Sequence, residues 1–354
     1  MTAPFRFGLI GAGGIAATHA DALAASEVAE LVAVAAGRQA GEFAARHGCD
    51  HELEPEALLA RSDLDGVILC TPSGARLELA LAAAERGKHV LVEKPLEVTV
   101  ARSRTMIEAC AAAGVTLGVI FQSRFAPGVA AAAAAVRAGA LGTPVLGEIQ
   151  VAWYRPPSYY ASGAWRGTHA LDGGGALMNQ GIHAVDQLLW LMGDATFVAA
   201  RSTRRLHTEI EVEDLITAQL TFASGALGTL SASTACAPGW ARRTEACGTA
   251  GSIRLVDDTI ERWDLPNMPD PREAQQDGGH VAAPDRDAGP PAGTSSPTVA
   301  GSALHQAQID DFVQAVRTGR APRVDGREGL RSVALVEAAY RSAAADGRPV
   351  GVEV

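Results

Sequence analysis

Residues 7–16 of the chain read FGLIGAGGIA, a run of apolar and very small side chains. Gly11, Gly13 and Ala16 occupy the small positions of a G-x-G-x-x-G/A pattern, between an apolar run typical of a strand and a segment of helical period. Gly11 permits a tight turn, Gly13 lets the backbone approach a pyrophosphate, and Ala16 allows close packing of helix on sheet. Backbone amides at the helix N-terminus then face the anion. The pattern therefore predicts a dinucleotide-binding turn, formed by Gly11, Ala12, Gly13, Gly14 and Ile15.

Five short apolar runs alternate with segments of helical period over about the first 120 residues, as strand-helix units of a parallel sheet do. Ser73 with Gly74 marks the start of one helix, Ala75–Arg86, and Gly87 marks its end. This setting favours dinucleotide binding over an unrelated glycine-rich turn, and a P-loop is excluded because no Gly-Lys-Ser/Thr follows. The predicted strands are Phe5–Ile10, Leu31–Ala36, Gly66–Cys70, His89–Val92 and Val115–Phe121.

Beyond Arg124 the pattern changes to longer strand candidates with few helical segments between them. A turn at residues 223–225 separates two of these runs and predicts an antiparallel hairpin. We expect an α/β protein with a doubly wound parallel sheet in residues 1–124. We expect residues 125–354 to form a second α/β domain with a large, mostly antiparallel open sheet, and we allow for its closing helices within residues 303–346 to pack back on the first domain. The strand candidates are Val145–Tyr154, Thr196–Arg204, Leu215–Phe222 and Ala226–Thr234, and the helices are Ala303–Thr318 and Arg327–Asp346.

One segment, Gln275–Ser302, is rich in Pro, Gly, Asp and Ser and has no apolar periodicity. This composition predicts an exposed loop. A tolerated surface insertion is the favoured interpretation, and a functional lid is the alternative.

The composition of the 354 residues is that of a globular protein, with 47% hydrophobic and 20% charged residues. A net charge of -10 without a Lys/Arg run argues against a nucleic-acid partner. Five widely spaced cysteines form no C-x-x-C pair and fit reduced thiols. The apolar run Phe7–Ala17 contains four glycines, unlike a signal peptide, and no stretch has the length of a membrane span. We therefore expect a cytoplasmic protein with no membrane partner.

The choice between NAD and NADP depends on the end of the second predicted strand, where NAD-preferring folds carry Asp or Glu. Here Gly37 and Arg38 occupy that place, and no carboxylate is present to repel a 2′-phosphate. Because a guanidinium can bind a phosphate with two hydrogen bonds, NADP is somewhat favoured over NAD. The alternative is that Arg38 stacks on adenine or faces solvent.

A lysine follows the fourth predicted strand in the sequence Glu93-Lys94-Pro95. Ligands of open α/β sheets bind at the carboxyl ends of strands, so Lys94 is predicted to point at the nicotinamide. Its ammonium could donate to the substrate oxygen and stabilise a developing alkoxide. The alternative is a solvated surface charge.

A second candidate stretch, residues 172–186, reads DGGGALMNQGIHAVD and leads from glycines into a helix. Asn179 and His183 are four residues apart and share one face of that helix. An imidazole titrates near neutral pH, so His183 can accept the hydroxyl proton as hydride leaves the same carbon. We predict that His183 is the general acid/base, whereas a structural histidine is the alternative; Asp186 orients or caps.

Taken together, these motifs resemble the glucose-fructose oxidoreductase, inositol dehydrogenase and MocA family, in the order G-x-G-x-x-G/A, E-K-P and G-G-G…G-x-H-x-x-D. Weaker matches are Cys70-Thr71-Pro72, Gln122 with Arg124, Trp165-Arg166, and Tyr340 in the last helix. The likeness covers nearly the whole chain. It implies a Rossmann domain followed by an α/β domain whose open sheet often forms an oligomer interface, here a homodimer or homotetramer.

The resemblance also implies site residues and an NAD(P)-dependent reaction at the hydroxyl-bearing carbon of a sugar, inositol or sugar derivative. Asn179 stands where the family often has Asp, and because an amide accepts no proton, the base role falls on His183. Arg76 stands where His is common, which leaves a cofactor contact there in doubt. The implied cofactor residues include Gly37, Arg38, Thr71, Pro72, Glu93, Lys94 and Gln122. The implied substrate residues are Lys94, Arg124, Tyr160, Trp165, Arg166, His169, Asn179 and His183, some of which could instead support the fold.

Two alternative functions stay open at this point. One is a catalytically silent dinucleotide-binding sensor, since a fold does not fix a function. The other is an enzyme that oxidises a sugar carbon transiently, cleaves a glycoside and recycles its NAD. No metal is expected, because His169, His183 and Asp172 lack the spacing of a zinc site.

Overall fold

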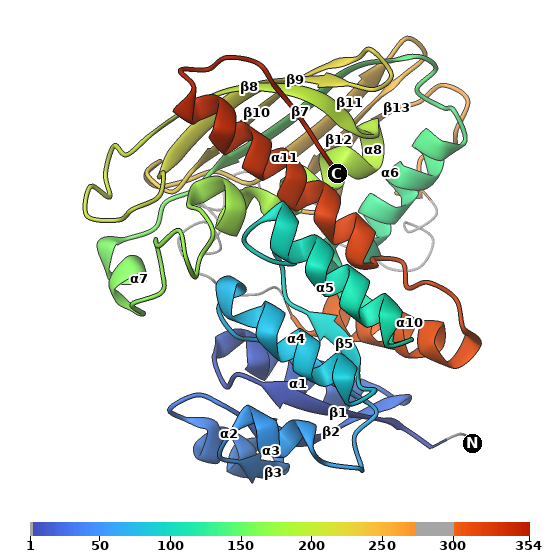
Figure 1. The fold of residues 1–354 in the computed structure, drawn as a ribbon. Helices are drawn as coiled ribbons and strands as arrows, with labels where there is room; N and C mark the ends of the chain where they lie inside the picture. Colours follow the sequence, from blue (N-terminus) through green and yellow to red (C-terminus); the bar gives the residue numbers. More distant parts are fainter. Residues whose placement is uncertain (1–2, 274–300) are drawn as a thin grey trace. The chain divides into compact units, whose positions relative to one another are not determined.

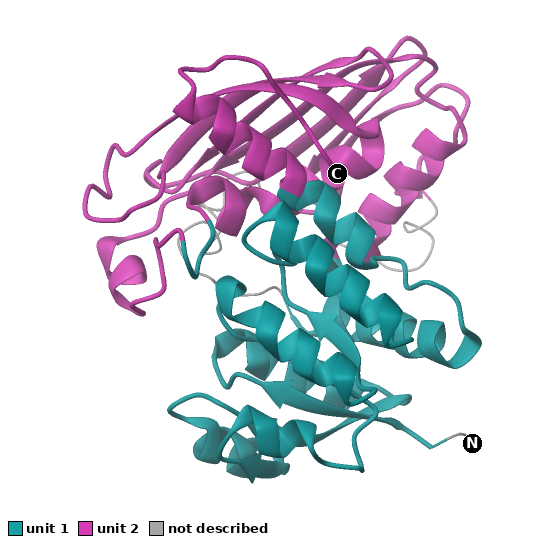
Figure 2. Ribbon diagram, viewed as in Figure 1, with its two compact units in different colours: residues 1–122, 170–173, 299–333 teal, residues 123–169, 174–298, 334–354 magenta. Residues whose placement is uncertain are grey.

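The chain folds into two units, each with its own sheet, in a computed structural model that describes residues 3–273 and 301–354 (Figure 2). Unit 1 comprises residues 1–122, 170–173 and 299–333, and unit 2 comprises residues 123–169, 174–298 and 334–354. The boundary in the N-terminal half lies two residues before the predicted one. The loop predicted at Gln275–Ser302 falls, up to residue 300, outside the described residues.

Unit 1 contains a parallel sheet of six strands in the order β3-β2-β1-β4-β5-β6 (Figure 1). The five predicted strands are confirmed with ends shifted by up to two residues. The missed strand, β3, has three polar residues at the sheet edge and so lacks an apolar signature. The strands are β1 (Phe5–Ile10), β2 (Ala29–Ala35), β3 (Asp50–Glu52), β4 (Gly66–Leu69), β5 (His89–Val92) and β6 (Leu117–Val119).

The helices of unit 1 cover this sheet and bury its apolar side chains. Phe5 and Phe7 of β1 contact Phe312 of α10, with ring centroids 6.5 Å and 6.1 Å apart. A helix more than 290 residues later in the chain therefore completes the core of the first sheet. The helices are α1 (Gly14–Ala25), α2 (Ala40–His47), α3 (Pro55–Leu59), α4 (Arg76–Glu85), α5 (Val100–Ala112), α10 (Ala303–Thr318) and the first part of α11 (Gly326–Ala344), with 3-10 turns η1 (Ser73–Ala75) and, at the unit boundary, η2 (Gln122–Phe125).

Unit 2 contains an eight-stranded sheet in the order β13-β12-β11-β7-β10-β9-β8-β14 (Figure 1). Its pairs are antiparallel except β10 with β7, which confirms the predicted mostly antiparallel sheet. The predicted β9–β10 hairpin is also confirmed, with Gly225 at φ +86° in its turn. The strands are β7 (Pro144–Ala152), β8 (Ala195–Thr203), β9 (Leu215–Phe222), β10 (Leu227–Ser233), β11 (Arg243–Gly248), β12 (Ser252–Val256), β13 (Thr259–Asp264) and β14 (Val350–Gly351).

One face of this second sheet is buried against α8 (Ile182–Met192). The approach is close, since a Cβ added at Gly147 of β7 would lie 2.7 Å from Met192 and 2.9 Å from Leu188. On the opposite face of the sheet, Phe197 and Leu227 are 53% and 60% exposed. Unit 2 also contains α6 (Pro127–Arg137), α7 (Pro157–Ala161) and the π-helical segment η3 (Ala176–Gly181).

Among the residues described, no helix combines the length and apolar character needed to cross a membrane.

Candidate functional site

The glycine turn of unit 1 has the geometry that a dinucleotide-binding loop requires. Gly11 has φ +108°, and a Cβ there would lie 2.9 Å from the carbonyl of Cys70, so only glycine fits. At Gly13 and Gly14 an added Cβ would meet nothing within 4 Å, so space is open in front of the first turn of α1. No side chain caps that N-terminus. Its amides can therefore bind an anion such as a pyrophosphate.

Two buried polar atoms at the carboxyl edge of the same sheet fit a bound dinucleotide. Thr71 Oγ1, just after β4, and Gln122 Oε1, just after β6, have no hydrogen-bond partner among the described residues. The strand order changes direction between β1 and β4, which is where open α/β sheets bind nucleotides. Buried polar groups are nearly always satisfied, so a polar ligand is the natural partner for both atoms. Arg38 is exposed beyond β2, next to Gly37 at φ +110°.

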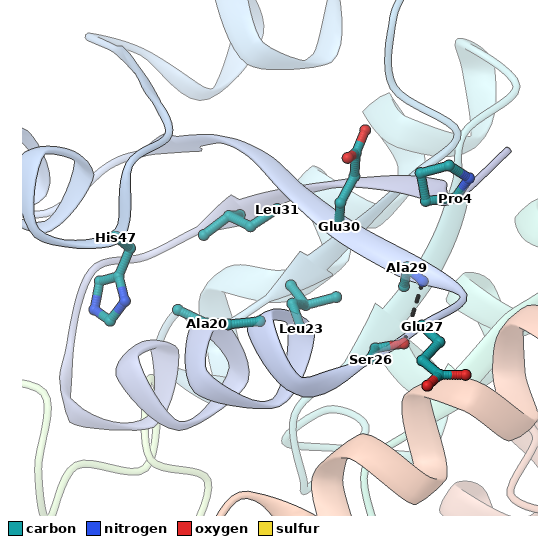
Figure 3. Close-up of a pocket in the computed structure, with 10 residues that line it drawn as sticks. Pro4, Ala20, Leu23, Ser26, Glu27, Ala29, Glu30, Leu31 and His47 are labelled. Atoms are coloured by element: carbon teal, nitrogen blue, oxygen red, sulfur yellow. Dashed lines mark hydrogen bonds between the residues drawn. The ribbon is translucent and has the colours of Figure 1, made fainter.

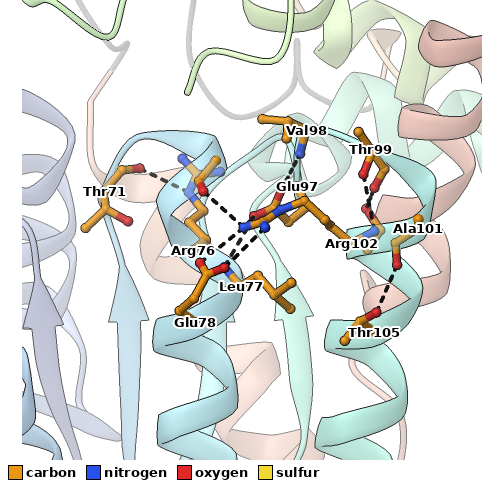
Figure 4. Close-up of polar contacts among 12 residues, drawn as sticks. Thr71, Arg76, Leu77, Glu78, Glu97, Val98, Thr99, Ala101, Arg102 and Thr105 are labelled. Carbon is orange, nitrogen blue, oxygen red and sulfur yellow. Dashed lines mark hydrogen bonds and ion pairs between the residues drawn. The ribbon is translucent and has the colours of Figure 1, made fainter. Parts of the chain in front are cut away.

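The residues around Lys94 hold its backbone in place. Arg76, 5% exposed at the start of α4, donates from Nε to the carbonyl of Thr71 at 3.1 Å (Figure 4). Its Nη1 donates to the carbonyls of both Glu93 and Pro95, on either side of Lys94. At the position where the family resemblance leaves a cofactor contact in doubt, the Arg76 guanidinium thus makes three hydrogen bonds to the chain itself. Lys94 is half-buried and lies two residues after β5.

The buried carboxylate of Glu97 holds the loop after Pro95 (Figure 4). Glu97, fully buried, accepts hydrogen bonds from the backbone N–H of Leu77 at 3.3 Å and of Val98 at 2.6 Å. Arg102 of α5 donates to Glu97 at 3.0 Å and also to Glu78 on α4 at 3.1 Å. These bonds tie α4, α5 and the loop together.

Sequence reasoning missed a buried cluster formed by His19, Glu93 and His305, which contacts the segment around Lys94 (residues 93–98, the Lys94 loop). Glu93 forms a 2.8 Å hydrogen bond with His19 of α1 and accepts from the backbone N–H of Lys94 at 3.1 Å. His305 of α10 meets the ring of His19 edge to face, with centroids 5.1 Å apart. Burial alone would raise the pKa of Glu93, but the hydrogen bond and charge of His19 lower it. Burial, with a smaller effect of His19, lowers the pKa of His305 to about 4.

His19, Glu93 and His305 are also the group in the described part of the chain whose ligand atoms lie close enough for a metal ion. Nitrogen and oxygen ligands about 2.0–2.1 Å from a tetrahedral zinc lie roughly 3.3 Å apart. The His19–Glu93 separation of 2.8 Å is shorter and is that of a hydrogen bond. The cluster is therefore a hydrogen-bonded support for the Lys94 loop.

The predicted histidine of unit 2 follows an irregular helical segment. Asn179 lies in η3, a single π-helical stretch of the kind often found at functional sites, and His183 lies in the first turn of α8. Both side chains are half-buried. The helix predicted here is present, but its first six residues are π-helical rather than α-helical.

Glu213 and Tyr340 hold η3, and sequence reasoning assigned a role to neither. The carboxylate of Glu213 accepts from the backbone N–H of Gly175 and of Leu177, both at 2.9 Å, and from the Tyr340 hydroxyl at 2.9 Å. The Tyr340 hydroxyl accepts from the backbone N–H of Met178 at 3.2 Å. These hydrogen bonds favour the carboxylate and lower the pKa of Glu213, but burial has the larger effect and raises this pKa to about 7.

The predicted substrate residues of unit 2 fall into different environments. Arg124 is 1% exposed and forms two hydrogen bonds to Asp186 of α8, at 2.8 Å and 2.6 Å, which fits the fold-supporting alternative for this residue. Tyr160 is half-buried and its hydroxyl hydrogen-bonds Thr234 at 2.9 Å. His169 is exposed. Trp165 and Arg166 pack together, with the guanidinium 4.4 Å from the ring centroid.

A surface hollow in unit 1 is separate from the glycine turn (Figure 3). It has a volume of about 420 Å³ and lies between α1 and β2, where Leu23, Ser26 and Glu30 line it. None of the predicted site residues contributes to its lining.

Comparison with known proteins identifies both halves of the chain. Residues 5–121 match the family described as "Oxidoreductase family, NAD-binding Rossmann fold", and residues 129–254 match the "GFO/IDH/MocA C-terminal domain". D-apiose dehydrogenase of Paraburkholderia graminis is 31% identical over 98% of this chain and 89% of its own length. Inositol 2-dehydrogenase of Rhizobium meliloti is 28% identical over 96% of this chain and 97% of its own.

Among solved structures, the WlbA dehydrogenase of Bordetella pertussis, in complex with NADH and UDP-GlcNAcA, superposes with a TM-score of 0.85. It is 30% identical, and the match covers 99% of this chain and all of that one. Matches to both domains, in order, and relatives aligned over nearly the full length confirm the resemblance predicted from the motifs. The chain is thus an oxidoreductase with an NAD-binding Rossmann domain and belongs to the GFO/IDH/MocA family.

Proposed function

We propose that the protein is an NAD(P)-dependent dehydrogenase that transfers hydride between the nicotinamide and a hydroxyl-bearing carbon of a sugar, inositol or sugar derivative. The observation that carries this proposal is the support of Lys94: its neighbours on both sides are hydrogen-bonded to Arg76 at the carboxyl edge of the Rossmann sheet. A lysine at a solvated surface would need no such support. The names of relatives, D-apiose dehydrogenase and inositol 2-dehydrogenase, favour the same substrate class.

In the proposed reaction the residues of the chain bind, orient and move protons. A dinucleotide would be held by Gly11–Ile15, with its pyrophosphate at the glycine turn, together with Gly37, Arg38, Thr71, Pro72, Glu93, Lys94 and Gln122, and its nicotinamide would accept or donate the hydride. The Lys94 ammonium donates a hydrogen bond to the substrate oxygen and stabilises negative charge that develops on it. His183 takes the hydroxyl proton in the oxidation and returns it in the reverse direction. Asn179 orients the hydroxyl, because an amide both donates and accepts but carries no removable proton near neutral pH.

For the cofactor we propose a preference for NADP over NAD. Arg38 is exposed beyond β2, and no carboxylate occupies the end of that strand to repel a 2′-phosphate. NAD is the alternative cofactor, because a related structure was solved in complex with NADH.

We also propose that the protein acts in the cytoplasm as a homodimer or homotetramer. The five cysteines are free thiols. Phe197 and Leu227, exposed on the open face of the second sheet, supply apolar area for self-association. Sedimentation of the purified protein at micromolar concentration gives the assembly size directly, and a monomer would refute the oligomer.

The test of the reaction is the absorbance of the reduced nicotinamide when sugars, inositols and sugar acids are added with NAD or with NADP. Growth of the band with one substrate supports net dehydrogenase activity. We expect His183→Ala to lower kcat by about 10²- to 10⁴-fold. The control is His51→Ala, at an exposed position of β3. A near-normal rate in the His183 variant with every substrate accepted by the wild type would refute the proposed base.

The same experiment separates the two alternatives. Binding of dinucleotide without any change in absorbance, and without products, favours the sensor. Release of a cleaved glycoside without net nicotinamide reduction favours the NAD-recycling enzyme.

A further inference from the structure

Arg155, three residues after β7 in unit 2, is a buried cation without an anionic partner. It is 4% exposed, and the one hydrogen bond from its guanidinium to a described residue runs from Nη2 to the amide oxygen of Gln180 at 2.9 Å. Its Nε and Nη1 are buried and have no acceptor in the described part of the chain. These two atoms carry three of the five N–H groups of a guanidinium.

The other buried arginines of the described chain show how unusual this is. Arg124 and Arg242 are paired with the carboxylates of Asp186 and Asp258. Arg76 has no carboxylate but donates to three backbone carbonyls. Among the described residues, Arg155 is therefore the buried arginine whose guanidinium leaves two nitrogens without acceptors, and a polar ligand would supply them.

A second arginine lies in the same part of unit 2. Arg166 donates from Nη1 to the hydroxyl of Tyr159 at 2.7 Å and from Nε to Ser162 at 3.0 Å, and it forms no ion pair with a described carboxylate. Both guanidinium groups lie over the ring of Tyr159, Arg166 at 4.2 Å and Arg155 at 5.4 Å from its centroid. Burial lowers the pKa of Arg155, and the positive charge of Arg166 adds to this effect.

The aromatic contacts of Arg155 do not replace the missing acceptors. Tyr159 and Trp153, 5.1 Å away, face the π-surface of the guanidinium and stabilise its charge. The N–H groups point outward in the guanidinium plane, where a ring face offers no acceptor. A purely structural stack would therefore leave these donors unsatisfied in the interior.

Hydrogen bonds connect these two arginines to the candidate catalytic segment. Gln180 accepts from Arg155 through its oxygen, and its Nε2 donates to the Tyr159 hydroxyl at 2.8 Å and to the Asn179 side chain at 3.0 Å. His183 follows Asn179 by four residues. A group bound by the two arginines would thus be linked through Gln180 to Asn179, which is proposed to orient the substrate hydroxyl.

We propose that Arg155 and Arg166 form a subsite for an oxyanion of the substrate, a carboxylate or a phosphate, so that the preferred substrate is an acidic sugar rather than a neutral polyol. This inference rests on the proposed function for the redox step, whereas the binding of the anion does not depend on it. An oxyanion supplies the acceptors that Arg155 lacks and neutralises two neighbouring cations. The hydroxyl-bearing carbon would then be oriented from the acidic end of the substrate.

Matched substrate pairs test the proposal in kinetics. The probes are D-glucose with D-glucuronate and D-glucose 6-phosphate, followed by D-galactose with D-galacturonate. We expect kcat/KM for one acidic class to exceed that of its neutral parent by at least about 10-fold, and Arg155→Gln to reduce it by about 10- to 100-fold, mainly through KM. Preference for the carboxylates or for the 6-phosphate identifies the source of the oxyanion. Arg166→Gln is a second variant, and Arg104→Gln, at an exposed position of α5, is the control.

Thermal unfolding of the NADP-loaded protein with the same probes gives a readout independent of turnover. D-glucuronate or D-glucose 6-phosphate should raise Tm of the wild type and of Arg104→Gln, but not of Arg155→Gln, whereas D-glucose should not. Equal kcat/KM for acidic and neutral sugars, or no anion-dependent Tm shift in the wild type, would overturn the subsite. Absence of nicotinamide reduction with every compound, beside an intact Tm shift, would refute the proposed function and leave the anion subsite standing.

Discussion

Replacement of Arg76 by glutamine removes the side chain that holds the backbone on both sides of Lys94. Arg76 is 5% exposed and donates to the carbonyls of Thr71, Glu93 and Pro95. The shorter amide of a glutamine could not make all three of these hydrogen bonds. Each buried carbonyl that loses its donor costs about 1–3 kcal/mol, so we expect the unfolding free energy to fall by about 3–5 kcal/mol in all. At about 2–4 °C per kcal/mol for a unit of this size, Tm should fall by roughly 10 °C.

The same substitution should impair the reaction more than cofactor binding. Because an error of about 1 Å in the position of a reacting group can cost about 10²-fold in rate, we expect Arg76→Gln to lower kcat by about that factor. The dissociation constant for NADP should change less, since Arg76 bonds only the backbone of the proposed cofactor residues Thr71 and Glu93 and makes no hydrogen bond to the glycine turn. Steady-state kinetics, cofactor titration and thermal unfolding give the three readouts.

The control is Arg86→Gln at the end of the same helix. Arg86 is exposed, and its side chain makes one hydrogen bond to a described residue, to the carbonyl of Ala82 at 3.0 Å. If Arg76→Gln matched this control in both Tm and kcat, the Lys94 loop would not depend on Arg76 and the reasoning would be wrong.

Three further substitutions probe η3, the buried histidines and the cofactor. Tyr340→Phe removes the hydroxyl that bridges Glu213 and the N–H of Met178, and it should lower the unfolding free energy by about 1–3 kcal/mol and reduce kcat at unchanged KM. Burial lowers the pKa of His305 from 6.5 to about 4, so the folded state binds fewer protons than the unfolded state between these pH values. The unfolding free energy should therefore be at its full value above pH 6.5 and fall by about 3 kcal/mol as the pH drops to 4. His305→Asn should remove this loss in urea unfolding followed across that range. Arg38→Ala should raise KM for NADP by about 10- to 100-fold and leave KM for NAD unchanged.

Each of these variants has a matched control at a position that makes none of the contacts in question. The control for Tyr340→Phe is Tyr154→Phe. An equal loss of kcat in this control would show that the Tyr340 hydroxyl has no special role. For the buried histidine it is His51→Asn, exposed on β3, and unchanged acid sensitivity in the buried variant would contradict the assignment. For the cofactor it is Arg46→Ala, exposed on α2, and equal KM changes for both dinucleotides would show that Arg38 does not contact a 2′-phosphate.

Much of the fold could be predicted because its signals are local. Apolar runs with both faces covered, the glycine turn at Gly11 and the hairpin at Gly225 depend on neighbouring residues and on backbone conformations that few residue types adopt. Short polar strands such as β3 have no such signal and were missed. The lysine after β5 is a prediction of the same local kind, since the carboxyl end of a parallel strand is a known ligand position, and its role stays a proposal.

The supports of the candidate site could not be read from local patterns, because each joins segments far apart in the chain. His19, Glu93 and His305 meet only once α1, β5 and α10 pack around one sheet. Likewise, Glu213 and Tyr340 are 127 residues apart and meet at η3. The unsatisfied guanidinium of Arg155 has no sequence signature at all, since an arginine becomes conspicuous only when folding buries it and places no carboxylate beside it. Local sequence patterns therefore predict the elements and nominate the candidate reacting groups, whereas long-range packing decides which buried charges find partners within the chain.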